Sequence, residues 1–506
     1  KTSKMLAITK WRIEQRLLVL HMQRRFKRKE SQRKKTNTIR AQEYFDVAYP
    51  PVYGPRWPSI RLALLSKQKY VAVINNFANH ELTVENFQDL GAVDIRHKYS
   101  IIADRMKASK KQKAQQVSEE CEESFSEDQR DTEDSELIRP SLVKLDDDEL
   151  AARAKVEPIS RYPEEYQLRA LAKDPTLGAA EFDNTSRVIL PSEVGTRGTS
   201  IMMDYVPATK LKGLENWIEE TDIFVQQGDR EIGFITEKQE EPINLPSMLK
   251  VYAFAKGDIS DFPQPKMDHH LKVLDYYALD GASLLPVLAL DIQAGEKVLD
   301  LCAAPGGKTL IALQTILPGI VVSNDASESR GNRIRETLRQ YIPHGISSFE
   351  RHSVITKSDG CNIREKEAYD KILVDVPCLT DRLSLKEDDN SIFKTTRTKE
   401  RLSLPELQSN LLASALQAVR PGGTVVYSTC TLSPLQNDGV VYLALSKLWQ
   451  ETTIECTIVD MSYAVRPLSF LYRFGTNLGL RYGQIVLPSL LNNFGPMYVA
   501  KIRRLR

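Results

Sequence analysis

The 506-residue chain has few cysteines, no long apolar run and almost no net charge. Its six cysteines show no paired spacing, so a disulfide framework is not expected in a chain of this length. The longest apolar stretch, near residues 282–290, is far shorter than the roughly 20 residues that cross a bilayer. These absences argue against a disulfide-stapled secreted domain and against a membrane span. They leave each cysteine as a candidate reactive thiol in a reducing compartment.

The net charge of +2 conceals a strong segregation of charge along the chain. Residues 1–40 carry fourteen Lys or Arg and two Glu, whereas residues 118–148 are dominated by Glu and Asp. The basic tail over residues 1–44 has three interpretations of similar weight. They are a mitochondrial transit peptide, a nuclear address or nucleic-acid arm, and a solvated disordered tail.

Composition divides the remaining chain into four segments. A helical pattern opens near Trp57, with Ser59 as the expected N-cap, and continues to Tyr70. The stretch that follows is rich in charged and amide residues and poor in aromatics, so it cannot bury enough surface to offset chain entropy. The expected segments are a helical N-terminal region (45–104), an acidic disordered linker (105–160), a partly ordered connector (161–249) and a folded C-terminal domain (250–506).

From about residue 250, short apolar runs rich in Val, Ile and Leu alternate with helical stretches. Strands are expected at 297–302, 320–324, 371–376 and 424–428, and helices at 309–316, 328–341 and 404–419. Such alternation predicts an α/β domain whose mostly parallel, doubly wound sheet carries helices on both faces. Ligands of these sheets bind beyond the carboxyl ends of the strands, which is where the motifs described next fall.

A loop of small residues leaves the first of these strands and opens a helix. Its sequence, DLCAAPGGKT over residues 300–309, lets a ligand approach the backbone closely, and the helix N-terminus offers free N–H groups. A phosphate-binding P-loop needs Gly at position 302, where this chain has Cys. A nucleoside-type cofactor is therefore favoured over nucleotide hydrolysis, while a plain tight turn is the simplest alternative.

Two acidic turns follow the next strands. Asp325 ends the second strand, where a carboxylate can bond ribose hydroxyls, and it can equally cap the helix that starts near Ser327. Asp359 and Gly360 form a further acidic turn, which is simply a turn when it is considered alone. In series with the other acidic positions, it favours a contact with an adenine amine.

Two cysteines end the later strands, Cys378 after Asp-Val-Pro and Cys430 after Ser-Thr. A single cysteine is most often a small buried hydrophobe, but two at matched strand ends favour a shared cleft. One reaction that would use such cysteines is methylation of carbon 5 of cytosine, because this carbon becomes nucleophilic when a thiolate adds to carbon 6. A carboxyl group bonded to ring nitrogen 3 would stabilise the adduct, and Asp375 is placed for that role. Paired bases are out of reach, so the target must be unpaired or flipped out.

The loop after the first of these cysteines carries four basic residues, Lys394, Arg397, Lys399 and Arg401. They would bind RNA phosphates and make the affinity depend on salt. The alternative, a solvated charged loop, is favoured when the run is considered alone.

Together these motifs resemble the Nol/Nop/Sun family of RNA (cytosine-5)-methyltransferases, which implies a Rossmann-like S-adenosylmethionine-dependent methyltransferase fold. The motifs are DLCAAPGGKT (300–309), DVPC (375–378) and STCTLS (428–433). Within the family, the mitochondrial ribosomal-RNA member is most similar. That likeness rests on WPSIR (57–61), GDIS (257–260), ASLLPVLAL (282–290) and NFGPMY (493–498).

The resemblance implies roles for individual residues. It implies that Cys430 is the nucleophile and that Cys378 helps to release the product, a division that spacing alone leaves open. The residues implied to contact the methyl donor, S-adenosyl-L-methionine, are Gly306, Gly307, Lys308, Asp325, Arg330, Asp359, Gly360 and Asp375. No residue is assigned to a metal ion.

The resemblance also implies partners and a place in the cell. It implies small-subunit ribosomal RNA as substrate, an mTERF-family protein as RNA-binding partner, and the mitochondrial matrix as location, with the nucleus or nucleolus as the alternative. The chain departs from many family members at Leu279, where Gln is usual, and at Asp438, where Glu is usual. Two other functions are weighed: a methyltransferase for protein or small molecules, and a non-catalytic ribosome-assembly factor on the same fold.

Overall fold

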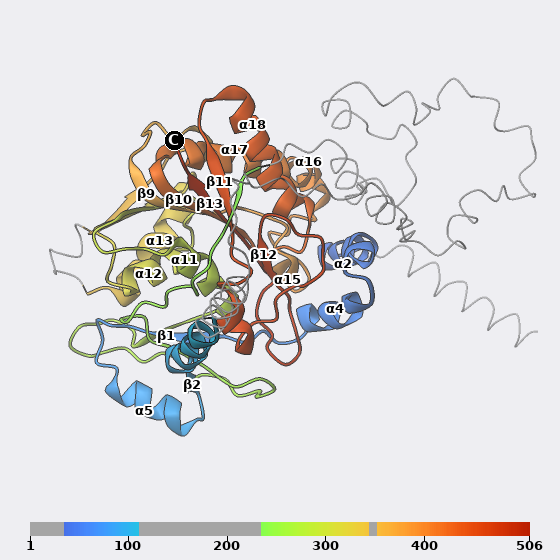
Figure 1. Cartoon of the computed structure of the whole chain (residues 1–506). Coiled ribbons are helices and arrows are strands. Elements are labelled where there is room, and N and C mark those ends of the chain that lie inside the picture. Colours follow the sequence, from blue (N-terminus) through green and yellow to red (C-terminus); the bar gives the residue numbers. More distant parts are fainter. Residues whose placement is uncertain (1–34, 111–233, 344–351) are drawn as a thin grey trace, which may run out of the picture. The chain divides into compact units, whose positions relative to one another are not determined.

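The computed structural model describes residues 35–110, 234–343 and 352–506 (Figure 1). Contacts divide the chain into two units, Lys1–Ala114 with Asn216–Arg506 and Gln115–Glu215, and every described residue belongs to the first. Most of the predicted linker and connector, and most of the predicted basic tail, lie outside the described residues. Within the described ranges, no helix has the length and apolar character needed to cross a bilayer.

A large sheet of nine strands forms the centre of the described unit. Its strands are β3 (Thr236–Lys238), β6 (Lys297–Asp300), β7 (Ile320–Asn324), β8 (Ser353–Thr356), β9 (Tyr369–Asp375), β10 (Val419–Thr429), β11 (Cys456–Asp460), β12 (Gln484–Val486) and β13 (Met497–Arg504). Five neighbours run parallel in the order β10-β9-β6-β7-β8, and antiparallel β13 separates β10 from β11. The predicted α/β architecture with a mostly parallel sheet is confirmed.

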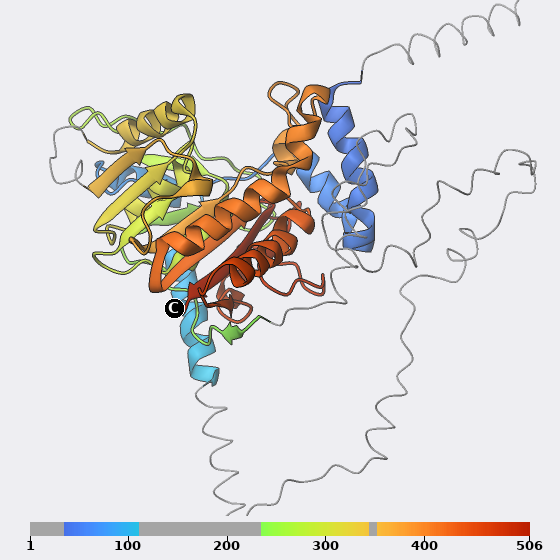
Figure 2. The same ribbon diagram turned by 90° about the horizontal axis from the view of Figure 1, so that it is seen from above.

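Helices cover both faces of this sheet. The main helices that pack on the sheet are α11 (Leu284–Leu290), α12 (Gly307–Gln314), α13 (Glu328–Tyr341), α17 (Leu404–Ala418) and α18 (Val440–Glu451). The first three share one hydrophobic core, and the last two share another on the opposite face, where Figure 2 shows them side by side in orange and red. The shorter helical turns are η3 (Gly281–Ser283), η4 (Gly360–Asn362), α15 (Asp381–Ser384), η5 (Thr395–Arg397), α16 (Thr398–Leu402), η6 (Leu435–Gly439) and η7 (Arg466–Phe470).

A second, four-stranded antiparallel sheet joins the N-terminal region to the chain near residue 250. Its strands are β1 (Val71–Ile74), β2 (Val93–Asp94), β4 (Val251–Ala253) and β5 (Tyr276–Leu279), in the order β2-β4-β1-β5. The ring of Phe87 packs on Tyr252 and Tyr276, at centroid distances of 5.8 and 5.0 Å. The sequence predicts only helices for residues 45–104, and its boundary at residue 250 separates strands that pair directly, such as β1 and β4.

The predicted helices of the N-terminal region are present, with different bounds. They are α2 (Asn37–Ala48), α3 (Pro50–Tyr53), η1 (Gly54–Arg56), α4 (Trp57–Leu65) and α5 (Glu81–Asp89). The prediction of Ser59 as an N-cap is wrong, because α4 begins at Trp57 and Pro58 occupies its first turn, where no N–H is needed. The predicted disordered linker also begins too early, because residues 105–110 continue a helix that starts at residue 95.

Candidate active site

The residues predicted for the site gather at the carboxyl edge of the large sheet. Strands β6, β7, β8, β9 and β10 lie next to one another and run parallel, so all of them end at this edge. The strand ends and the segments that follow them carry every predicted site residue. Residues 300–309 are called the donor loop, residues 376–381 the Cys378 turn and residues 429–433 the Cys430 turn.

Two glycines of the donor loop stand where a side chain cannot fit. Gly306 has a left-handed φ of 106°, and a Cβ there would lie 3.3 Å from the backbone of Ile334. A Cβ on Gly307 would lie 2.8 Å from the hydroxyl oxygen of Tyr277. Helix α12 begins at Gly307, two residues before its predicted start, directly after this left-handed residue. Both glycines are therefore required by packing, whatever the loop binds.

Asp300 is the buried acid at the base of the donor loop. Its Oδ2 accepts a hydrogen bond of 2.7 Å from Thr309 Oγ1, but its Oδ1 has no hydrogen-bond partner among the described residues. Burial raises the pKa of Asp300 to about 7, although the bond from Thr309 opposes the shift. A buried carboxylate oxygen without a partner is costly, so the site favours a ligand that brings a cationic or N–H group.

Asn324, at the end of β7, ties three segments of the edge together. Its Nδ2 donates to the carbonyl oxygens of Leu301 at 3.1 Å and of Ser358 at 3.0 Å. Its Oδ1 accepts from Thr356 Oγ1 at 3.0 Å and from the Ser358 backbone N–H at 2.9 Å. The sequence marks this residue only as the end of a strand. The one available signal of its role was an amide at the end of a strand that begins with three apolar residues.

Asp325 is buried and faces the start of α13. Its carboxylate accepts a hydrogen bond of 3.0 Å from the Ser327 backbone N–H, in the turn before the helix. The interpretation of Asp325 as the N-cap is wrong, because Ser327 occupies that position and α13 has no side-chain cap. The same carboxylate lies 3.2 Å from the guanidinium of Arg330, whose side chain is largely exposed. The geometry thus brings together two of the residues that the resemblance implies for the donor.

Asp359 caps the short helix η4. Its Oδ1 accepts from the Cys361 backbone N–H at 3.0 Å, and its Oδ2 accepts from Asn362 Nδ2 at 2.8 Å. A Cβ on Gly360 would lie 2.8 Å from Leu411, so this glycine lets α17 approach closely. The turn interpretation accounts for both residues, and any contact with a ligand would be additional to it.

Asp375 joins the donor loop to the strand that leads to Cys430. Its Oδ2 accepts a hydrogen bond of 2.5 Å from Lys308 Nζ, and its Oδ1 accepts one of 2.8 Å from Ser428 Oγ. Burial lowers the pKa of Lys308, but the Asp375 carboxylate outweighs burial and the net shift is upward. Both side chains are more than two-thirds shielded from water, which strengthens the attraction between them.

The two cysteines at this edge are in direct contact. The Sγ atoms of Cys378 and Cys430 are 3.2 Å apart. Cys378 is buried and Cys430 is partly exposed. The contact with Cys378, together with burial, raises the pKa of Cys430 well above its ordinary value, while Lys308 opposes the shift. At rest Cys430 is therefore a neutral thiol, and a nucleophilic role requires added positive charge or a proton acceptor.

The basic residues that follow the Cys378 turn are partly committed within the protein. Arg397 pairs with Glu400 at 2.5 Å. Arg401 is only 7% exposed, and its guanidinium lies 4.8 Å from the ring centre of Phe393. Two of the four predicted phosphate-binding cations thus have structural partners, which favours the structural interpretation for them.

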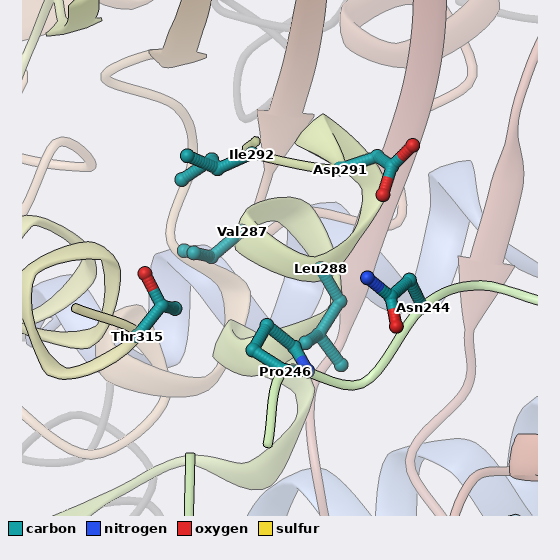
Figure 3. A pocket seen from close by; sticks show the side chains of 7 residues that line it. All are labelled: Asn244, Pro246, Val287, Leu288, Asp291, Ile292 and Thr315. Atoms are coloured by element: carbon teal, nitrogen blue, oxygen red, sulfur yellow. The ribbon is translucent and has the colours of Figure 1, made fainter. Parts of the chain in front are cut away.

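Two hollows lie outside the cysteine-bearing edge. One, beside the ends of α11 and α12, is lined by Asn244, Pro246, Val287, Leu288, Asp291, Ile292 and Thr315 (Figure 3). The other is an open groove along α13, lined by Met267, Lys272, Asn332, Arg335, Glu336, Arg339 and Gln340. The second groove has three cations against one carboxylate, which suits a polyanion.

Comparison with known proteins assigns the chain to a family. Residues 287–501, which include the donor loop and both cysteine turns, match the family described as 16S rRNA methyltransferase RsmB/F. The chain is 35% identical over 93% of its length to "5-cytosine rRNA methyltransferase nsun-4" of Caenorhabditis elegans, of which it covers 93%. It is 36% identical over 92% of its length to "5-cytosine rRNA methyltransferase NSUN4" of Xenopus laevis, covering 90% of that protein.

The sequence identity to a mammalian relative is higher, but the matching region spans less of the chain. The chain is 48% identical over 51% of its length to "5-cytosine rRNA methyltransferase NSUN4" of Mus musculus, of which it covers 67%. The mostly parallel strand order, with antiparallel β13 inserted between β10 and β11, agrees with a methyltransferase fold of the Rossmann-like type. The chain therefore belongs to the RsmB/F family of methyltransferases, the Nol/Nop/Sun family that its motifs indicate.

Proposed function

We propose that this chain uses S-adenosylmethionine to methylate carbon 5 of cytosine in the small-subunit ribosomal RNA of mitochondria. The observation that carries the proposal is the 3.2 Å contact between the thiols of Cys378 and Cys430, close to the Lys308–Asp375 ion pair. Methyl transfer to nitrogen or oxygen needs no thiol at the reacting centre, so a protein or small-molecule methyltransferase leaves this pair unexplained. The relatives described above carry the name 5-cytosine rRNA methyltransferase.

The residues of the donor loop fit S-adenosylmethionine. The Asp300 Oδ1 atom is a buried acceptor without a partner among the described residues, and Gly306 and Gly307 let a ligand approach the start of α12. The residues proposed to hold the donor are Gly306, Gly307, Lys308, Asp325, Arg330, Asp359, Gly360 and Asp375. When bound, the donor supplies an electrophilic methyl group on a positively charged sulfonium.

Cys430 is the proposed nucleophile. Lys308 favours its thiolate form, and the positively charged sulfonium of a bound donor would add the further positive charge that ionisation of the thiol requires. The thiolate adds to carbon 6 of cytosine, which breaks the aromatic system and makes carbon 5 enamine-like. Asp375 stabilises the adduct at ring nitrogen 3. Cys378 helps the last step, in which a base takes the carbon-5 proton, the double bond between carbons 5 and 6 re-forms, and Cys430 leaves carbon 6 as a thiolate. The target base is unpaired or flipped out, because a stacked base cannot reach both thiols.

RNA binding is proposed to involve the groove along α13. Lys272, Arg335 and Arg339 line it, and the two arginines belong to α13, the helix that also carries Arg330 beside the donor site. Exposed guanidinium and ammonium groups bind phosphates and release counterions, so the RNA affinity should fall steeply with salt.

The proposed protein partner is an mTERF-family protein, and the proposed location is the mitochondrial matrix. The exposed side chains of Leu62 and Leu65 offer a partner an apolar surface on α4. The Arg-rich, acid-poor N-terminus supports a mitochondrial location. So does a likeness of 43% identity, over 48% of the chain and 64% of the relative, to "tRNA (cytosine(34)-C(5))-methyltransferase, mitochondrial" of Danio rerio.

Covalent trapping on RNA tests the proposed chemistry. Purified protein is incubated with ribosomal RNA and labelled S-adenosylmethionine and is then run on a denaturing gel. Cys378→Ala should accumulate a covalent RNA adduct, because the adduct forms but is not released, whereas Cys430→Ala should give none. Cys456→Ala, at the start of β11, is the matched control and should behave as the wild type.

Two outcomes would contradict the proposal in different ways. An adduct yield that is the same in all three variants would refute the roles assigned to the thiols. An intact protein that transfers no label to any RNA would instead favour the non-catalytic assembly factor.

A further inference from the structure

Two tyrosines of the N-terminal helices reach the cysteine turns. Tyr49, which follows α2, donates a hydrogen bond of 2.8 Å to Asp381 Oδ2 and lies 3.3 Å from Thr431 Oγ1. Tyr53, at the end of α3, donates a hydrogen bond of 2.6 Å to the carbonyl oxygen of Leu432. Both tyrosines are buried, and Figure 1 shows α2 beside α15, the helix that Asp381 begins.

Asp381 links the two cysteine turns directly. The same Oδ2 that accepts the tyrosine hydroxyl also accepts a hydrogen bond of 2.8 Å from the Leu432 backbone N–H. Leu432 is thus held through both its N–H and its carbonyl group, two residues beyond Cys430. Asp381 lies three residues beyond Cys378. The Asp381 carboxylate and the Tyr49 hydroxyl therefore connect the backbone segments that carry the thiols, and the Tyr53 hydroxyl ties the Cys430 turn to α3.

The backbone of the Cys378 turn is strained where these contacts hold it. Thr380 has a left-handed φ of 48°, which a β-branched residue adopts only when its surroundings impose it. Helix α2 contacts the same segment further along the chain. Its Asn37 backbone N–H donates to Asp388 Oδ1 at 2.5 Å, and Phe45 packs on Phe393 at a centroid distance of 5.3 Å.

We propose that Tyr49 and Tyr53 are positioning residues that set the separation of the Cys378 and Cys430 thiols. The importance of that separation for methyl transfer rests on the function proposed above. The two hydroxyls come from 332 and 379 residues upstream of the groups they bind, so the reacting centre is completed by the N-terminal helices. Without the Tyr49 hydroxyl, the bridge between Asp381 of the Cys378 turn and Thr431 of the Cys430 turn is lost, and without the Tyr53 hydroxyl the Cys430 turn loses its bond to α3.

Replacing the tyrosines by phenylalanine separates positioning from stability. Tyr49 stacks on Phe45 at 5.1 Å and packs edge-on against Trp57 at 5.2 Å, and these ring contacts survive when only the hydroxyl is removed. A suitable control is Tyr99→Phe, because Tyr99 is also buried and donates to a backbone carbonyl, that of Ile243, in the core on the other face of the sheet.

Steady-state kinetics of the full chain give the first readout. Tyr49→Phe and Tyr53→Phe should each lower kcat roughly tenfold, since a displacement of reacting groups by about 1 Å can cost up to about a hundredfold. The KM for S-adenosylmethionine should stay unchanged, because the donor loop makes none of these bonds. The melting temperatures should match that of Tyr99→Phe.

Disulfide formation measures the same separation without methyl transfer. Diamide takes two electrons and two protons from the thiols of Cys378 and Cys430, becomes the corresponding hydrazine, and leaves a disulfide that peptide mass spectrometry identifies. We expect this reaction to be severalfold slower in Tyr49→Phe and Tyr53→Phe than in the wild type or in Tyr99→Phe. If one variant fails to fold, the other carries the test.

Rates of methyl transfer and of disulfide formation that equal those of Tyr99→Phe in both variants would overturn the proposal. A Cys430→Ala variant that still methylates RNA would refute the proposed function instead. The disulfide measurement would keep its meaning in that case, so the two failures can be told apart.

Discussion

The two halves of the carboxyl edge are held together in different ways. The donor half, from β6 to β8, is tied by local contacts: Asn324 bonds to groups no more than 34 residues away. The thiol half, after β9 and β10, is contacted by Tyr49 and Tyr53 from 332 and 379 residues upstream. The proposed cofactor site can thus be formed by one contiguous α/β segment, whereas the centre proposed to receive the base also involves the N-terminal helices.

The largest expected effect on the rate of methyl transfer comes from breaking the Lys308–Asp375 ion pair, which links the two halves. Lys308→Met removes the charge that pairs with Asp375 and favours the Cys430 thiolate, so single-turnover methyl transfer should fall roughly a hundredfold. Lys371→Met is the matched control, because Lys371 is equally shielded and pairs with Glu296 away from the site. Equal rates for the two variants would show that the ion pair does not couple the halves.

Asn324→Ala should damage the donor half alone. The variant leaves the Leu301 and Ser358 carbonyl groups without their amide donor, which should cost about 2 kcal/mol in the free energy of unfolding. Calorimetry should show roughly tenfold weaker binding of S-adenosylmethionine, since about 1.4 kcal/mol corresponds to a factor of ten. Disulfide formation between the two thiols should be unchanged. Asn492→Ala, another buried amide, should affect stability but not donor binding.

The groove along α13 extends the comparison to RNA. The double variant Arg335→Glu with Arg339→Glu should weaken RNA binding and reduce the slope of log affinity against log salt concentration by about 2, if each arginine contacts one phosphate. Filter binding at several salt concentrations measures this slope. Lys238→Glu in β3 with Arg503→Glu in β13, at the other end of the sheet from β8, makes the same change in charge and should leave the slope unaltered.

The smallest expected effect is a change in the pH dependence of stability. In the folded chain burial raises the pKa of Asp300 to about 7, whereas its ordinary value is 3.8. Between these values the folded chain binds more protons than the unfolded chain, so this group lowers stability as the pH rises through that window. The slope is at most about 1.4 kcal/mol per pH unit. Asp300→Asn should remove this slope. Denaturant unfolding at pH 5 and pH 8 measures it, and a slope that persists in the variant would contradict the prediction.

Local sequence patterns suffice for much of the donor half. The strand over 320–324 and the helix over 328–341 are predicted at their observed bounds, because an apolar run and a 3.6-residue period specify each by itself. The pairing of β1 with β4 is not predictable in this way, because the two short strands are far apart in sequence and neither shows alternation.

The same limit applies to the site. Cys378 and Cys430 are predictable because they end predicted strands that lie side by side in a parallel sheet. The parts played by Tyr49 and Asp381 are not, because a tyrosine at a helix end and an acid in a turn have ordinary structural explanations. Only the folded chain shows that one carboxylate receives both a distant hydroxyl and the backbone of the other turn.

The pairing of Lys308 with Asp375 has a consequence for how the two substrates of this protein meet. The lysine belongs to the segment proposed to hold the small molecule, and the carboxylate is proposed both to help hold that molecule and to contact the base. Occupancy at either side changes the electrostatic environment at the other. Thermodynamic linkage then demands reciprocity: whatever factor the small molecule imposes on RNA affinity, RNA must impose on the small molecule in return.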